Sequence, residues 1–327
     1  QEMLVQLNAK SAKGTETAIK AIRKAGGRVL YAVPPQIIVA LLPQSEATKL
    51  VGKNGIIQIS PGPIEDGNTA TSAELTGNAL KVWNEHLNID RRLRAINSAE
   101  TSKRWDHAEY QPLHPPEGAI AEEAVGELER LEHAVMPMAL AATPIQTIPV
   151  LAGRIGIGLI FVDSTQPEFQ ITDGEHTKVI SEVTEGVNML SGFEPRAGIE
   201  WFFDVKRPGI TLPISDFSDV PSTSWEDIWR NAAMAEIGHK NSIEGMNDYI
   251  SSIKTQFNAQ WAYAIYVTKY PKPWFAYHWG NHLVLDFQMN EWGIDNLNLI
   301  VAHETAHIFG GADEYASSNC NCGDLFG

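Results

Sequence analysis

The chain has 327 residues, 43% of them hydrophobic, which is enough for about two domains with packed cores. Its 40 Asp and Glu outnumber its 25 Lys and Arg, so the formal net charge is -15 and no nucleic-acid partner is expected. The best apolar run, residues 150–162, is shorter than the roughly 18 residues that a membrane span needs and is interrupted by Arg154, so no membrane span is expected.

Residues 1–65 have the pattern of a small βαββαβ unit. Ala18, Ile19 and Ile22 fall on one face of a predicted helix, and Gly26-Gly27 ends it. Six elements in about 60 residues, in this order, are typical of a ferredoxin-like sandwich, so we predict a ferredoxin-like N-terminal domain. The predicted elements are strands over residues 3–7, 28–33, 36–42 and 56–60 and helices over residues 16–24 and 45–51.

Residues 66–143 have a weaker pattern, which predicts a linker with helical segments. Gly, Pro, Asn and Thr cluster on either side of it, and residues 120–135 place apolar side chains on one helical stripe among four glutamates. The pair Asp106-His107 could approach a metal site as an inhibitory plug, although such a pair is more often solvated surface.

Residues 144–327 are predicted to form a second domain in which strands and helices alternate. A strand over residues 155–163, a helix opened by the capping box Thr172-x-x-Glu175, and a strand over residues 199–205 make a βαβ unit with parallel strands. A second capping box, Thr223-x-x-Glu226, is expected to open a helix through residue 236. A further helix follows Ser242, and strands are expected over residues 261–267 and 282–287; the histidines near them, His278 and His282, are treated as ordinary polar residues.

The sequence His303-Glu304-x-x-His307 lies on a predicted helix that Asp295 or Asn296 could cap. The two histidines are one turn apart and therefore share a face, from which both imidazoles could bind one metal ion. Gly310-Gly311 should end the helix and turn the chain back, which could bring Asp313 to the ion as a third ligand. The alternative is a pair of hydrogen-bonded helical histidines without a metal, and Glu314 is an alternative ligand if the turn is looser.

The motif His303-Glu304-x-x-His307-x-x-Gly310-x-x-Asp313 resembles the extended zinc motif of the metzincin metalloproteases, in the variant with Asp in place of a third His. The resemblance implies that His303, His307 and Asp313 bind zinc and that Glu304 is the general base. It also implies an α/β (α+β) catalytic domain with a twisted mixed sheet, and it favours a secreted protein. The family has a methionine turn after the motif, whereas the last methionine of this chain, Met289, precedes it.

The family resemblance predicts a zinc-dependent endopeptidase that acts on protein or peptide substrates. An edge strand just ahead of the zinc helix pairs with the substrate in this family, and residues 282–287 are the nearest match. Residues 1–65 are similar to the inhibitor-like propeptides of some secreted proteases, so the N-terminal domain could cover the active site; a structural or interaction domain fits the pattern equally well. The alternatives are therefore a latent zymogen and a non-catalytic binding protein that zinc only stabilises.

Overall fold

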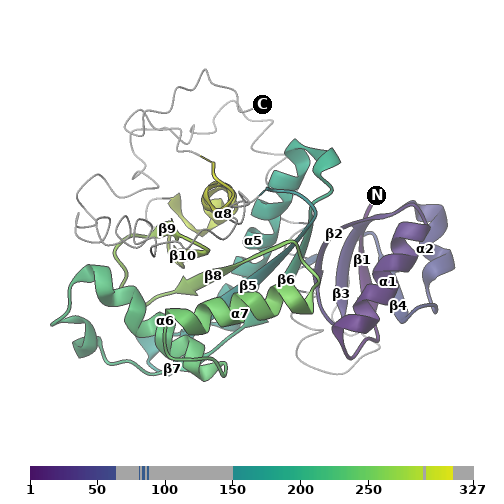
Figure 1. Cartoon of the computed structure of the whole chain (residues 1–327). Coiled ribbons are helices and arrows are strands. Elements are labelled where there is room, and N and C mark those ends of the chain that lie inside the picture. The colour runs from purple at the N-terminus through teal and green to yellow at the C-terminus, as the bar shows by residue number, and fades with distance from the viewer. Residues whose placement is uncertain (64–80, 82, 85–86, 88–149, 290–291, 312–327) are drawn as a thin grey trace, which may run out of the picture.

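The computed structural model describes residues 1–63, 81, 83–84, 87, 150–289 and 292–311. The described residues form a mixed α/β structure around a ten-stranded sheet. Nine of the strands follow the order β4-β1-β3-β2-β6-β5-β8-β10-β9, and β7 pairs with β5 outside this path (Figure 1). The sheet therefore continues from the N-terminal strands into the strands that precede the zinc-type motif.

The first 60 residues contain the six elements predicted for them, in the predicted order. The antiparallel pairs are β1 with β3, β1 with β4, and β2 with β3, so β1 and β2 flank β3. Ala18, Ile19 and Ile22 of α1 are fully buried against this sheet, as their helical spacing predicts. The elements are β1 (Glu2–Leu7), α1 (Ala12–Lys24), β2 (Arg28–Val33), β3 (Ile37–Leu41), α2 (Gln44–Leu50) and β4 (Ile56–Ser60).

The later part of the chain forms the rest of the sheet. The strands β6, β5, β8 and β10 are parallel neighbours, and β9 is antiparallel to β10 at the end of the order. The strands are β5 (Arg154–Ser164), β6 (Glu200–Lys206), β7 (Gly209–Ile210), β8 (Trp261–Thr268), β9 (Ala276–Trp279) and β10 (His282–Asp286). The helices are α5 (Asp173–Phe193), α6 (Trp225–Glu236), α7 (Ile243–Gln256) and α8 (Leu297–Ile308).

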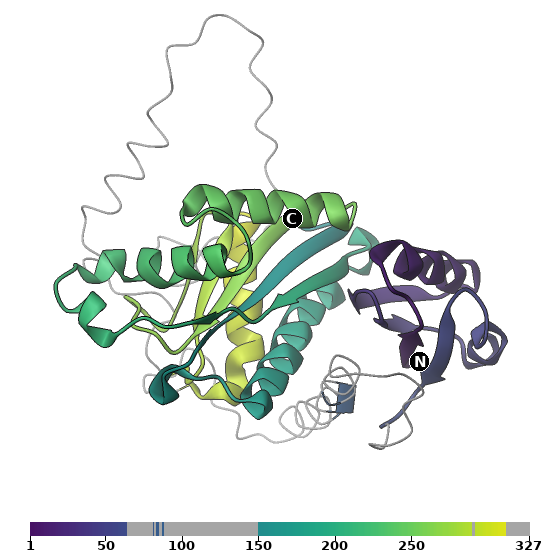
Figure 2. The same ribbon diagram turned by 90° about the horizontal axis from the view of Figure 1, so that it is seen from below.

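Helices cover both faces of the sheet. Helices α5 and α8 lie on one face, and α6 and α7 lie on the opposite face with α1 and α2 (Figures 1 and 2). Along β5, Ile157 and Leu159 belong to the core of the α5–α8 face, whereas Ile160 and Val162 belong to the core of the α7 face. Because both faces are covered, β5 is an almost continuous apolar run rather than an alternating one.

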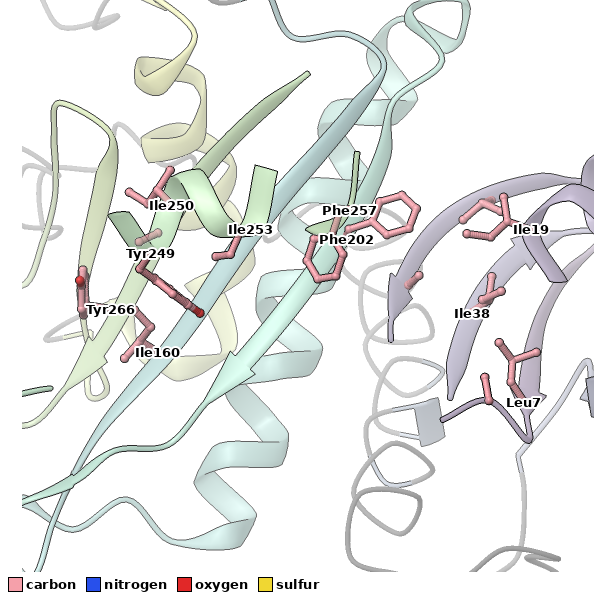
Figure 3. Packing of buried hydrophobic residues seen from close by; sticks show 14 of the residues in the cluster. Leu7, Ile19, Ile38, Ile160, Phe202, Tyr249, Ile250, Ile253, Phe257 and Tyr266 are labelled. Atoms are coloured by element: carbon pink, nitrogen blue, oxygen red, sulfur yellow. The ribbon is translucent and has the colours of Figure 1, made fainter. Parts of the chain in front are cut away.

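The N-terminal strands join the later strands through β2 and β6. These two strands pair in parallel at Tyr31 with Trp201 and at Ala32 with Phe202. The apolar core continues across the junction, where Figure 3 shows Phe202 beside Phe257 of the α7 region, with their ring centroids 5.7 Å apart. The N-terminal unit thus shares both a sheet and a core with the part of the chain that follows it.

Arg154 strengthens this junction. Its guanidinium pairs with Glu16 of α1 at 2.9 Å and with Glu200 of β6 at 3.6 Å, and its carbon Cζ lies 4.5 Å from the centre of the Phe202 ring. Arg23 of α1 forms a second ion pair with Glu200. Charged side chains of α1 therefore pair with charged side chains of β5 and β6 where the N-terminal strands meet the later ones.

The predicted linker is described only at residues 81, 83–84 and 87, and these residues are helical. Trp83 is 1% exposed, belongs to the same core as α5, and donates a hydrogen bond from its indole nitrogen to the Gly62 carbonyl at 2.9 Å. At this position the segment is part of the packed structure. The predicted helix over residues 120–135 and the pair Asp106-His107 lie outside the described residues.

The two predicted capping boxes have different outcomes. Thr172 and Glu175 form theirs at the start of α5, which confirms that prediction. The box predicted for Thr223 and Glu226 is wrong, because α6 begins at Trp225 with Ser224 as its N-cap. The Glu226 carboxylate instead lies in a buried cluster with charged and hydroxyl groups from β9, β10 and α6, where it makes stronger hydrogen bonds than a cap would offer.

None of the helices in the described parts of the chain is both long and apolar enough to cross a membrane.

Candidate metal centre

Helix α8 carries the motif and is fixed from two sides. Its residues Leu297, Ile300 and Val301 are fully buried in the core that α5 shares with the sheet. The approach of α5 is close because Gly186 has no side chain: a Cβ there would lie 2.4 Å from the Asn298 carbonyl oxygen. On its other side, α8 lies against β9 and β10. The sequence thus places the motif on a buried helix rather than on a mobile loop.

The two histidines of the motif meet as their spacing predicts. Their Nε2 atoms are 3.0 Å apart, and the ring planes are nearly perpendicular at 88°. Two nitrogens that bind one zinc ion tetrahedrally at 2.0–2.1 Å are separated by about 3.3 Å, so a shift of about 0.3 Å would admit the ion. Without an ion, the His303 Nε2–H can donate a hydrogen bond to His307 Nε2 at the observed distance.

The glycine bend after α8 determines which nitrogen of His307 faces the site. The helix ends at Ile308, and Gly310 has φ of +83°, as the prediction of a glycine-terminated helix requires. The bend brings the Gly311 carbonyl oxygen to 2.8 Å from Nδ1 of His307. An acceptor at Nδ1 keeps the proton on that nitrogen and leaves the lone pair on Nε2, which is the tautomer that a metal ligand needs.

Glu304 lies inside the site rather than at its surface. Its side chain is fully buried, and one carboxylate oxygen is 3.8 Å from Nδ1 of His278. His278 comes from β9, and its ring stacks on that of His307 with centroids 4.7 Å apart and planes 24° apart. The site therefore contains a third imidazole that the motif does not include.

No sequence motif includes His278, because its place in the site depends on where its strand lies in the sheet. Alternation along β9 points Ala276 and His278 toward α8, whereas Tyr277 points toward the opposite face and donates a hydrogen bond to Glu226. His282, treated together with His278 as an ordinary polar residue, lies on the Tyr277 side and contacts Glu226 at 2.8 Å. The period-2 alternation was a usable signal, but nothing local indicates that β9 lies beside α8.

Two sets of donors could hold a metal within the described residues. Ligand atoms of His278, Glu304 and His307 lie within 4.8 Å of one another. However, the rings of His278 and His307 are stacked nearly parallel, whereas His303 and His307 bring their Nε2 atoms within 3.0 Å of each other. The geometry therefore favours the motif histidines as the metal-binding pair, and two neutral imidazoles are a donor set that zinc prefers.

The other predicted site residues lie outside the described part of the chain. These are Asp313, the predicted third ligand, and Glu314, its alternative. The third ligand therefore stays a prediction.

The predicted substrate-pairing strand is wrong. Residues 282–287 were expected at the edge of the sheet, but β10 is hydrogen-bonded on both sides, to β8 and to β9. The last strand in the order is β9. The reason is that residues 276–279, which are rich in aromatic side chains, form a strand of their own and extend the sheet by one position.

Comparisons of the chain with protein-family models, with curated protein sequences and with solved structures gave no match.

Proposed function

We propose that this protein is a zinc-dependent endopeptidase of the metzincin type, with His303, His307 and Asp313 as the zinc ligands and Glu304 as the general base. The observation that supports it most is the convergence of the two Nε2 atoms, 3.0 Å apart, on a helix whose next carboxylate is buried beside them. The resemblance of the motif adds to it, as does the antiparallel strand β9, which is the last in the strand order of the described residues.

The residues have distinct parts in the proposed reaction. A zinc ion held by the motif would supply Lewis acidity and make a water molecule acidic near neutral pH. Glu304 accepts the proton of that water as its oxygen attacks the peptide carbonyl carbon, and later delivers a proton to the departing amine. Strand β9 is the last strand of the sheet among the described residues, and in this proposal its outer edge holds an extended peptide through backbone hydrogen bonds that read little side-chain sequence.

Metal content and cleavage of an unfolded protein test the proposal together. We expect the purified chain to contain zinc and to cleave fluorescein-labelled casein, and we expect a chelator to abolish cleavage until zinc is returned. Glu304→Gln should retain zinc and lose about 10³-fold in kcat, because the amide cannot accept the proton. Equal cleavage by both proteins would remove Glu304 from the mechanism.

Two other outcomes would point to the alternatives. Zinc binding without cleavage by the intact chain or by any cut form would indicate a protein that zinc only stabilises. An intact chain that becomes active only after a protease cuts within residues 64–149 would indicate a latent zymogen.

A further inference from the structure

The N-terminal unit carries positive charge in a chain that is acidic as a whole. Residues 1–63 contain eight Lys and Arg against three Glu, a surplus of five positive charges. Because the whole chain has a formal net charge of -15, the residues after position 63 have a surplus of 20 negative charges. A cationic surface kept on such a chain favours a partner of the opposite charge.

A groove of about 530 Å³ lies between the two helices of this unit. Helices α1 and α2 pack on the same face of the sheet, α1 through Ile19 and α2 through Leu50, as Figure 1 shows for the helices. They make few contacts with each other, so the space between them stays open. We call it the lysine groove, after the four lysines that line it, Lys20, Lys24, Lys49 and Lys53.

The lysines stand on both walls of the groove. Lys20 and Lys24 are one helical turn apart on α1, whereas Lys49 of α2 and Lys53 just after it belong to the opposite wall. All four are exposed. Within the described residues, three of them have no ion pair, and Lys49 pairs with Glu46. The groove therefore has three cationic groups that are free to bind carboxylates.

The floor of the groove is apolar. Ala21 and Ala25 line it from the α1 side, and Leu50, which is 9% exposed, lines it from α2. Alanine side chains let a partner approach the helix closely, and the lysine stems add apolar carbon above them. An apolar strip between two rows of cations is complementary to a helix whose apolar stripe has carboxylates on both sides.

We propose that the lysine groove binds an acidic amphipathic helix of a partner protein. The apolar stripe of that helix lies on Ala21 and Leu50, and its carboxylates pair with the lysines. Lys20 and Lys24 are about 6 Å apart along α1, which is also the spacing of two glutamates one turn apart on a partner helix. No aromatic side chain lines the groove for a base to stack on, which disfavours a nucleic acid. The inference does not depend on the proposed peptidase function.

Three labelled peptides test the proposal by fluorescence anisotropy with the full chain. The first has leucines on one helical face and glutamates on both sides of that face. In the second the glutamates are replaced by lysines, and in the third the leucines are replaced by serines. We expect saturable binding of the first peptide alone. Its Kd should rise with salt, because exposed ion pairs are screened.

Two double variants separate the groove from the general charge of the unit. Lys20→Glu combined with Lys24→Glu reverses one wall, whereas Lys10→Glu combined with Lys13→Glu makes the same charge change at exposed lysines that do not line the groove. We expect the first pair to raise the Kd of the acidic peptide at least about tenfold, and the second pair to change it less than about threefold. Both should keep the parent Tm, because all four side chains are exposed.

Several results would overturn the proposal. Equal weakening by the two double variants would mean that the overall charge attracts the peptide without a groove. Tighter binding of a labelled single-stranded DNA of the same length would assign the surface to nucleic acid. A concentration-dependent dimer that Lys20→Glu with Lys24→Glu dissociates would make the occupant a second copy. Peptide binding that appears only when the glutamates within residues 120–135 are replaced would make it a segment of the chain itself.

Discussion

At the scale of single residues, His176 should make the protein sensitive to acid. Burial on α5, with its ring 4.0 Å from Phe161, lowers the pKa of this imidazole to about 4, and the positive charge of Arg207 adds to the effect over the opposing carboxylates. Between about pH 6.5 and 4 the unfolded chain therefore binds a proton that the folded chain does not. The free energy of unfolding should fall as the pH falls through this range and be unaffected by His176 above it.

The substitution His176→Phe tests this expectation. The difference in unfolding free energy between pH 7 and pH 4.5, measured with a denaturant, should shrink by on the order of 2 kcal/mol in the variant, because Phe does not titrate. An unchanged difference would mean that other groups cause the acid sensitivity.

Also at this scale, the motif residues could be predicted from sequence whereas His278 could not. His303, Glu304 and His307 are related by helical spacing alone, and Gly310 reveals the end of the helix. His278 reaches the site only because β9 lies at the end of the sheet next to α8. No local sequence pattern predicts that position of β9.

At the scale of elements, the contact between α5 and α8 should position the candidate metal centre. Gly186→Ala places a methyl group 2.4 Å from the Asn298 carbonyl oxygen, so one helix must move. We expect this change to lower the free energy of unfolding by about 1–3 kcal/mol and to weaken zinc binding, because α8 carries both motif histidines. Calorimetry and a zinc titration in competition with a chelator measure the two effects.

Gly192→Ala is the matched control on the same helix. No heavy atom lies within 4 Å of a Cβ at Gly192, and alanine favours a helix over glycine, so the variant should be as stable as the parent or slightly more stable. If Gly186→Ala proves equally harmless, the close helix contact does not position α8.

Sequence patterns predict the start of a helix well where residues close in the sequence determine it. They predict it poorly where a contact with a distant part of the chain determines it. Thr172 and Glu175 form their predicted box because both are near the surface, and Glu175 accepts from the Thr172 N–H with one carboxylate oxygen while Lys269 pairs with the other. Glu226 follows Thr223 by three residues, as Glu175 follows Thr172, yet its side chain is buried in the core. Burial by itself would raise its pKa, but the charge and hydrogen bond of His282, helped by Arg230 and Tyr277, lower it to about 2.

At the scale of the whole molecule, residues 1–63 are part of the sheet and lie far from the candidate site. Four strands separate β2 from β9, which corresponds to roughly 24 Å between them at the usual strand spacing. The described part of the segment expected to cover the site therefore does not cover it. Pairing of β2 with β6 was not predictable, because strand patterns do not specify which strand will be the neighbour.

Removal of residues 1–63 should consequently destabilise the protein rather than activate it. The deletion exposes the edge of β6 with Trp201 and Phe202 and leaves Arg154 and Glu200 without Glu16 and Arg23. We expect a lower Tm and aggregation, measured by calorimetry and light scattering. A monomeric truncated protein that cleaves casein faster than the full chain would instead support latency.

A milder test of the same junction is Arg154→Ala. It should lower the free energy of unfolding by about 3 kcal/mol, because it leaves the mostly buried carboxylate of Glu200 with one partner fewer. Lys49→Ala, which removes an exposed pair with Glu46 on α2, should change it by less than about 0.5 kcal/mol.

Tyr277 and His278 are consecutive residues that face opposite sides of β9, and this has a consequence for how the edge strand is aligned. If β9 slipped by one residue against β10, the phenol would move to the face that carries the candidate metal centre and the imidazole would enter the cluster around Glu226. The hydrogen bond from the Tyr277 hydroxyl to Glu226 thus fixes the register of β9 against β10. A contact on one face of the sheet thereby keeps the His278 imidazole on the opposite face, beside α8.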